Sequence, residues 1–238
     1  MQDSGTQEQD GMARAGAAIL EAALPHVAFD GWSEATFRAA ITESGQPEAL
    51  ARALYPRGGL DLALAFHRAG DARMAERMEA ADLTGMRYSE KVAFAIRTRL
   101  EVIDDPETVR RGMTLFALPH HAGEGARALW GTADAIWHAL GDTSRDLNWY
   151  SKRAALSAVY GATVLYWLGD GSAGQAATAE FIDRRIADVM RIEKFKAGLR
   201  DNPLARIMRN RPGAREADPV APHPAEKDPA EALPGRWR

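Results

Sequence analysis

The chain has 238 residues, of which 46% are apolar, with a formal charge of −3 and no cysteine. This length and apolar content allow one large domain or two small ones with a sizeable core. The lack of cysteine excludes disulfides and thiolate metal sites, and the slightly acidic balance argues against a generally basic nucleic-acid binder. The first eleven residues are polar and acidic, unlike a secretory signal or a mitochondrial transit peptide, and no apolar run reaches the roughly 18 residues that span a membrane. We therefore expect a cytosolic protein whose membrane contact, if any, is peripheral.

The N-terminal part predicts a three-helix unit. Residues 1–11 are expected to be disordered, and apolar residues then recur at helical spacing over about 13–28, where Pro25 predicts a kink or an early end. Ser33 can cap a second helix over about 34–44, which Gly45 ends, and Pro47 begins a third helix over about 47–55. Over residues 12–58 this is the layout of a helix-turn-helix unit.

The rest of the chain predicts a longer helical bundle at 59–194. The expected helices cover about 60–80, 88–103, 106 to before Pro119, 121–140, 147–168 and 173–194. No long segment alternates with period two, so the fold class is all-α, and a three-helix unit followed by a bundle is the layout of TetR-type regulators. Residues 195–211 form a basic amphipathic segment of the kind that can lie in a membrane interface, and residues 212–238, with six of the twelve prolines, are expected to be disordered.

Two short motifs are interpreted as turns. The string GDGSAG at 169–174 matches GxGxxG, but a dinucleotide loop needs a preceding strand, and here a helix precedes it. We interpret it as an inter-helix turn with Gly171 in the left-handed conformation. His120, His121 and Glu124 could suggest a metal site, but adjacent histidines cannot lie on one helical face, so a polar turn is expected. Without a catalytic motif we expect no enzyme activity, no cofactor and no metal.

The charge of the helix-turn-helix unit argues against DNA binding. Residues 1–80 carry twelve acids and seven arginines, and the third helix offers only Arg52 and Arg57 for phosphate contacts. We expect no nucleic-acid partner. A TetR-type ligand-sensing transcriptional regulator remains the alternative function.

Residues 129–194 contain four of the six tryptophans. Such density favours an apolar cavity, a partner-binding surface or both, with ordinary core packing as the alternative for each tryptophan. Trp149 shares a helical face with Lys152 and Arg153 beside the polar turn 141–146. Charges are costly to bury unpaired, so we expect this corner to be exposed and to bind a partner. Asp134 and His138 are expected to form a surface pair.

The strings ADAIWHALGDTSRDLNWYSKRAALSAVY and FIDRRIADVMR resemble the COQ9 family of ubiquinone (coenzyme Q) biosynthesis accessory proteins. The resemblance implies a TetR-like fold, a homodimer, and an isoprenoid lipid bound in a hydrophobic cavity of the C-terminal bundle. It further implies that the protein presents quinone intermediates to a COQ7-type demethoxyubiquinone hydroxylase and touches the membrane through a C-terminal helix. Because the first residues do not read as a mitochondrial presequence, we expect a bacterial member of the family, peripheral on the inner face of the cytoplasmic membrane.

The resemblance also assigns roles to residues of this sequence. The partner surface would comprise Asp142, Asp146, Asn148, Trp149, Tyr150, Lys152 and Arg153. Apolar residues expected to line the cavity are Trp130, Ile136, Trp137, Tyr160, Val164 and Trp167. The membrane contact would comprise Lys194, Phe195, Lys196, Leu199, Arg200, Leu204, Ile207 and Met208.

Overall fold

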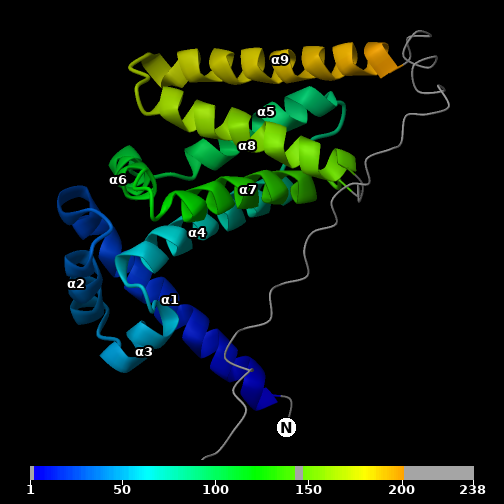
Figure 1. Cartoon of the computed structure of the whole chain (residues 1–238). Helices are drawn as coiled ribbons and strands as arrows, with labels where there is room; N and C mark the ends of the chain where they lie inside the picture. Colours follow the sequence, from blue (N-terminus) through cyan, green and yellow to red (C-terminus); the bar gives the residue numbers. More distant parts are fainter. Residues whose placement is uncertain (1–2, 143–146, 201–238) are drawn as a thin grey trace, which may run out of the picture. The chain divides into compact units, whose positions relative to one another are not determined.

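The computed structural model describes residues 3–142 and 147–200, with side chains described for 7–142 and 149–191, and these residues form helices but no strands (Figure 1). A first unit ends at Arg191, and of the second unit, residues 192–238, only the end of the last helix is described. The helices are α1 Asp3–Asp30, α2 Glu34–Ser44, α3 Glu48–Leu54, α4 Gly59–Ala80, α5 Tyr88–Glu101, α6 Pro106–Phe116, α7 Ala122–Ala139, α8 Leu147–Trp167, the short 3-10 helix η1 Ala173–Gln175 and α9 Ala176–Arg200.

Local sequence signals set the bounds of α2. The Ser33 hydroxyl accepts a hydrogen bond from the Thr36 amide at 3.2 Å, which satisfies one of the unpaired donors at the helix start. Gly45 ends the helix with φ of 65°, a conformation that glycine adopts at little cost. The side chain of Phe37 is fully buried between α2 and its neighbours. The predicted start and end of this helix therefore agree with the structure.

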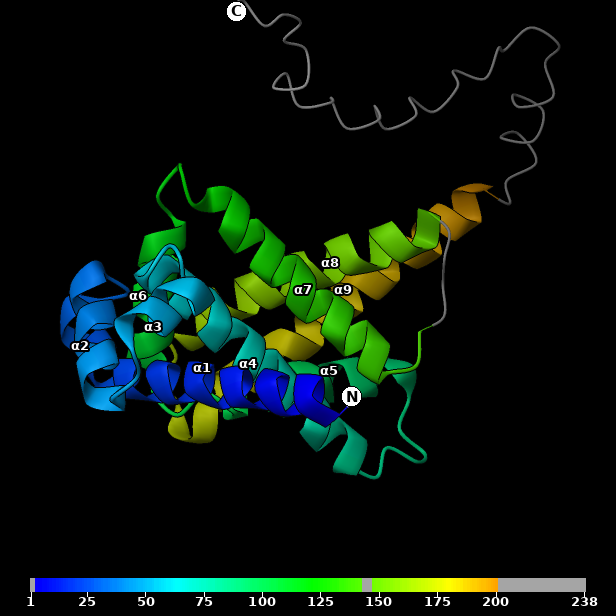
Figure 2. The same ribbon diagram turned by 90° about the horizontal axis from the view of Figure 1, so that it is seen from below.

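The first helix is longer than the sequence predicts. It begins at Asp3, so residues 3–11, expected to be disordered, are helical, and it continues through Pro25 to Asp30. Proline removes one backbone hydrogen bond and strains the preceding turn. Ala23 and Val27 are fully buried on either side of Pro25. We infer that their packing holds the helix together across the proline. Figure 2 shows α2 against the C-terminal part of α1.

A second core lies within the bundle. Helix α7 packs against both α4 and α8, and α5 packs against α4. Ile96, Ile136 and Ile182, from α5, α7 and α9, are all fully buried in one hydrophobic cluster. Burying each such side chain contributes about 1.5–3 kcal/mol to stability. No helix within the described ranges has the length and hydropathy that crossing a bilayer requires.

The turn before α9 is organised by an aspartate. The Asp170 carboxylate accepts hydrogen bonds from the Ser172 amide at 2.8 Å and from the amide and hydroxyl of Thr178 at 2.8 and 2.6 Å. Hydrogen bonds to Ser172 and Thr178 hold the pKa of Asp170 well below its usual range. The left-handed glycine of this turn is Gly174, with φ of 61°, rather than the predicted Gly171, because the chain reverses immediately before α9.

Candidate functional site

A cavity of about 530 Å³ lies within the first unit, between α4, α5, α6, α7 and α8. The buried side chains that line it include Trp32, Arg99, Thr108, Tyr160 and Val164. Its exposed lining residues form the mouth, and they are mostly small: Ala117, Ala122, Ala126, Ala158 and Leu165. The volume lies within the usual range of about 300–1,000 Å³ for ligand pockets.

Only two of the residues predicted to line the cavity do so, namely Tyr160 and Val164. Ile136 and Trp167 are buried in the bundle core instead. Trp137 stacks on Tyr88, with the ring centroids 5.7 Å apart. The remaining predicted residue is Trp130, which packs on the aromatic side chains of α8.

The cavity is shaped by small residues that the sequence analysis did not select. On α7 the lining positions include Ala122, Gly125, Ala126 and Leu129, at the spacing of one helical face. At Gly125 an added Cβ would lie 2.8 Å from the Cβ of Phe116, so α6 and α7 approach closely there. This run of small residues at helical spacing is the sequence signal that indicates the cavity, whereas the tryptophan-rich pattern marks mostly core and surface positions.

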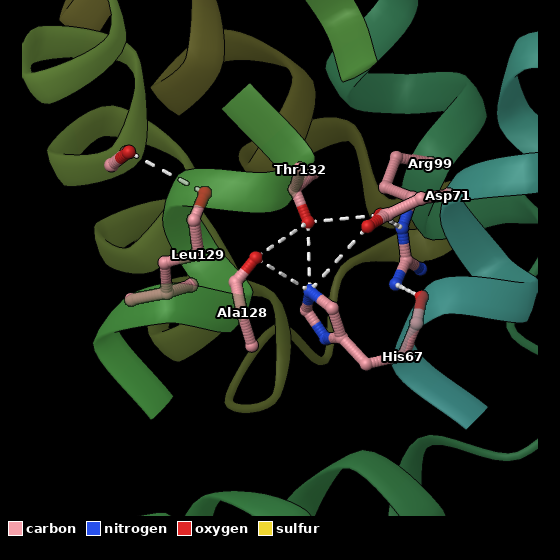
Figure 3. A network of polar contacts seen from close by, with 7 residues as sticks. His67, Asp71, Arg99, Ala128, Leu129 and Thr132 are labelled. Atoms are coloured by element: carbon pink, nitrogen blue, oxygen red, sulfur yellow. Dashed lines mark hydrogen bonds and ion pairs between the residues drawn. The ribbon is translucent and has the colours of Figure 1, made fainter. Parts of the chain in front are cut away.

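A polar network borders the cavity (Figure 3). Arg99 donates from Nε to Asp71 Oδ1 at 2.7 Å and from Nη2 to the carbonyl oxygen of His67 at 3.0 Å. The hydroxyl of Thr132 donates to the same Asp71 oxygen at 2.9 Å. An added Cβ at Gly70 would come within 2.6 Å of the Arg99 guanidinium, so only glycine leaves room for it.

Burial sets the protonation of two side chains in this wall. His67 Nε2 lies 3.1 Å from the carbonyl oxygen of Ala128 and 2.7 Å from Thr132 Oγ1. Because a carbonyl can only accept, Nε2 carries the proton. Burial lowers the pKa of His67, which keeps the ring neutral near pH 7, and burial also raises the pKa of Tyr160, which keeps its hydroxyl protonated.

Three aromatic side chains gather on the outer side of α7 and α8. Trp130 lies 5.8 Å from Trp149 and 6.4 Å from Tyr150 between ring centroids, and Trp149 meets Tyr150 edge to face at 4.7 Å. Tyr150 is 62% exposed, and both tryptophans are half-buried. We call Trp130, Trp149 and Tyr150 the aromatic cluster.

Arg153 packs against Trp149 of this cluster. The sequence predicted an exposed Arg153, but its side chain is buried. Its side chain is 4% exposed, and its guanidinium lies 4.0 Å from the ring centroid of Trp149. Its Nε donates to Asp134 at 2.5 Å, and its Nη1 lies 3.4 Å from Asp142, which also pairs with Lys152 at 2.8 Å. The charge is buried because two carboxylates compensate it, and Asp134 therefore pairs with Arg153 across the helices rather than with His138.

Several predicted positions lie outside the described residues. These are Asp146 and the side chain of Asn148 in the partner surface, the side chains of Lys194, Phe195, Lys196, Leu199 and Arg200, and the whole of Leu204, Ile207 and Met208. The segment 195–211 as a membrane contact therefore stays a prediction, as does the tail 212–238.

The arginines of the helix-turn-helix unit are engaged by acids. Arg52 forms an ion pair with Glu34 and lies 4.7 Å above the ring of Phe37. Arg57 donates to Asp61 at 2.9 Å and to Glu124 at 3.1 Å. Cations already paired in this way have less charge to offer a phosphate backbone.

The histidine pair at the start of α7 has no acidic third member. The rings of His120 and His121 lie 4.1 Å apart, but Glu124 points to Arg57. In the part of the chain that the structure describes, no group of three or more His, Asp or Glu residues is placed to hold a metal ion.

The fold is shared with a solved bacterial protein. The crystal structure of a TetR transcriptional regulator from Nitrosomonas europaea superposes with a TM-score of 0.58 at 19% identity, covering 72% of this chain and 95% of that one. At this identity the likeness shows the fold alone. The predicted all-α, TetR-like fold is confirmed.

Sequence comparisons identify more similar proteins. Residues 122–193 match the family model described as COQ9. "Ubiquinone biosynthesis protein COQ9, mitochondrial" of Drosophila melanogaster is 31% identical over 74% of this chain and 56% of its own length. The Dictyostelium discoideum protein "Probable ubiquinone biosynthesis protein coq9, mitochondrial" is 32% identical over 75% of this chain and 60% of its own length. The Homo sapiens protein of the same name as the Drosophila protein is 32% identical over 72% of this chain and 56% of its own length.

The comparisons correct the predicted location and confirm the predicted family. The expected place on the inner face of a bacterial cytoplasmic membrane is wrong, because the curated relatives are named as mitochondrial proteins. That prediction depended on the first residues of a chain that spans less than two thirds of these relatives, so those residues could not carry it. The match of residues 122–193 and the identity of about one third over nearly three quarters of the sequence show that this chain belongs to the COQ9 family.

Proposed function

We propose that this protein acts in ubiquinone biosynthesis by binding an isoprenoid quinone intermediate in the cavity and presenting it to a hydroxylase of the COQ7 type. The observation that carries the proposal is the cavity of about 530 Å³, whose lining is mostly apolar. The names of the curated relatives supply the pathway. A prenyl chain is poorly soluble in water and gains free energy on entering such a cavity.

The shape of the cavity suits a ligand with a long tail. Its inner wall is closed by buried side chains such as Trp32 and Val164, and its mouth opens between Ala126 and Ala158. A head and the first part of a tail fit within the cavity, and a longer tail would pass through the mouth. The role is non-catalytic in this proposal, because two polar side chains of the wall are already engaged: Arg99 bonds to Asp71 and to the carbonyl oxygen of His67, and the His67 ring bonds to Ala128 and Thr132.

The aromatic cluster is the proposed contact for the hydroxylase. Exposed aromatic side chains beside an arginine dominate the energetics of many interfaces. Arg153 would act there by holding the ring of Trp149, which it contacts at 4.0 Å, rather than by touching the partner.

We also propose a homodimer formed through α8 and α9. Tyr166 and Met190 are 38% and 45% exposed, and Tyr166 stacks on Phe181 with the ring centroids 4.4 Å apart. Exposed apolar side chains that cluster in this way mark interaction surfaces. Light scattering on the wild type should give the mass of a dimer, and Tyr166→Glu with Met190→Glu should give a monomer.

The test of the cavity is a titration with a short-tailed prenylated benzoquinone, followed by quenching of tryptophan fluorescence. Ala158→Trp places a large side chain at the mouth and should weaken binding at least tenfold. Ala154→Trp, one turn earlier on α8 and exposed but outside the cavity lining, is the matched control and should bind as the wild type does. Equal binding by both variants would refute the cavity as the binding site.

The test of the partner surface uses the purified hydroxylase. Trp149→Ala with Tyr150→Ala should weaken association by at least tenfold and leave quinone binding unchanged. Arg153→Glu is unsuitable, because it would place a third carboxylate beside Asp134 and Asp142 and threaten the fold. Arg38→Glu on α2 changes an exposed charge away from both proposed interfaces and should have no effect. Undiminished affinity in the Trp149 and Tyr150 variant would remove the cluster from the interface.

A further inference from the structure

An exposed tyrosine outside the aromatic cluster lies at the start of α5. Tyr88 is 46% exposed, and its ring stacks on that of Trp137, with the ring centroids 5.7 Å apart and the planes 23° from parallel. Trp137, near the end of α7, is 8% exposed and belongs to the core of the bundle. Figure 1 and Figure 2 both show the start of α5 and the end of α7 at the end of the bundle where α8 begins. Tyr88 is therefore not an isolated surface aromatic of the kind that needs no explanation.

The first turn of α5 holds Tyr88 in place. The backbone amide of Arg87 donates to the Glu90 carboxylate at 2.8 Å, and the Arg87 guanidinium donates to the same carboxylate at 2.9 Å. Hydrogen bonds of this kind fix the start of a helix, and Tyr88 is the first residue of α5. A side chain that is already stacked and positioned loses little conformational entropy when a partner covers it.

Printed contacts connect this corner to the aromatic cluster without a break. The Lys152 ammonium lies 5.4 Å from the Trp137 ring centroid and pairs with Asp142 at 2.8 Å. Asp142 lies 3.4 Å from Arg153, whose guanidinium contacts the ring of Trp149 at 4.0 Å. The side chains of Asp142 and Arg153 are 6% and 4% exposed, so this part of the network is buried. An exposed tyrosine thus lies at each end of one network of ion pairs and aromatic rings.

The charges within this network balance. Among the described residues that form it, the cations of Lys152 and Arg153 pair with the carboxylates of Asp134 and Asp142. The Tyr88 hydroxyl is protonated at neutral pH, because burial and the charge of Asp142 both raise the pKa of Tyr88. The surface that this corner offers is therefore aromatic rather than ionic, which favours an apolar segment of a partner.

We propose that the ring of Tyr88 contacts the hydroxylase directly, so that the partner surface extends from the aromatic cluster across the end of α7 to the start of α5 and binds an apolar segment of that enzyme there. This inference rests on the proposed function, because it takes the aromatic cluster as the contact for the hydroxylase. It adds a residue on a helix that the predicted partner surface does not reach. It also adds the chemical character of the segment that binds.

The first experiment measures proximity by photochemical cross-linking to the purified hydroxylase. A photoreactive benzoylphenylalanine in place of Tyr88 should cross-link to the enzyme on illumination, as should the same amino acid in place of Tyr150. Phe29, which is 85% exposed on α1, is the matched control position and should give no cross-link. A purely structural role of Tyr88 would give no cross-link from position 88.

The second experiment measures the affinity for the hydroxylase. Tyr88→Ala should weaken association about fivefold to tenfold, because it removes an aromatic contact from the interface. Tyr88→Phe keeps the ring and should bind as the wild type does, as should the control Phe29→Ala. Quinone binding should be unchanged in all three variants, because neither residue lines the cavity. If Tyr88→Ala does not fold, the cross-link still decides the matter.

The outcomes separate this inference from the proposed function. A cross-link from position 150 without one from position 88 would overturn the inference and leave the aromatic cluster as the partner surface. Unchanged affinity in Tyr88→Ala would overturn it as well. If Tyr88→Phe binds as weakly as Tyr88→Ala, the hydroxyl makes the contact and the apolar segment is refuted. If neither position cross-links, the proposed partner surface itself fails.

Discussion

The ion pair between Arg99 and Asp71 gives the sharpest prediction about stability. Replacing Arg99 with methionine keeps a long apolar stem but removes the hydrogen bonds to Asp71 and to the carbonyl oxygen of His67, of 2.7 and 3.0 Å. Breaking a buried pair by removing one partner costs about 3–5 kcal/mol, because the other charge is left buried. In the variant, Asp71 still accepts the hydrogen bond from the Thr132 hydroxyl at 2.9 Å, and its side chain is 13% exposed to solvent. We therefore expect a loss at the lower end of this range, about 3 kcal/mol.

That loss converts into a measurable shift in melting temperature. For a domain of this size each kcal/mol corresponds to about 2–4 °C, so Tm should fall by about 6–12 °C. Urea unfolding followed by circular dichroism gives the free energy directly, with an unchanged slope if the folded state stays compact. The double variant Arg99→Met with Asp71→Leu removes both charges and should recover most of the loss. A single variant within 1 kcal/mol of the wild type, or a double variant no more stable than the single one, would refute this account of the pair.

Three further predictions concern single positions. Gly70→Ala should destabilise the protein by about 2 kcal/mol in urea unfolding, because its Cβ would collide with the Arg99 guanidinium at 2.6 Å, whereas Gly131→Ala, where no atom lies within 4 Å, should not. Ser33→Ala should cost about 1 kcal/mol in the same assay by removing the helix cap at 3.2 Å, and a loss below 0.3 kcal/mol would count against the cap. Burial lowers the pKa of His67; the charges of Arg99 and Arg68 lower it further, and the charge of Asp71 raises it. Below about pH 6.5 the unfolded chain takes up a proton that the folded protein resists, so the stability of the fold should fall as the pH drops below that value. His67→Gln should flatten the decline in Tm between about pH 7.5 and 5.5, and an unchanged decline would contradict this assignment.

Local signals in the sequence were enough to place most helices. Ser33 and Gly45 bound α2 because a cap and a left-handed glycine are properties of a few neighbouring residues. Pro25 misled for the opposite reason, since the burial of Ala23 and Val27 against other helices decides whether the helix continues. That packing involves residues distant in sequence, which a local pattern does not contain.

Less of the candidate site than of the fold could be predicted from the sequence. The tryptophans were expected to line the cavity because large apolar side chains stand out, but a cavity forms where side chains are small, as at Gly125 and Ala126. The burial of Arg153 depended on Asp134 and Asp142, which approach it only once α7 and α8 pack together. A pair of this kind has no fixed spacing, so the charge was expected at the surface.

The central claim is that the cavity holds a prenylated quinone, and mass spectrometry of organic extracts tests it most directly. The wild-type protein and the variants Ala158→Trp and Ala154→Trp would be purified from ubiquinone-producing cells and extracted in parallel. The account predicts about one prenylated quinone or precursor per chain in the wild type and in Ala154→Trp, and little in Ala158→Trp. A folded wild-type protein whose extract contains no such lipid would contradict it.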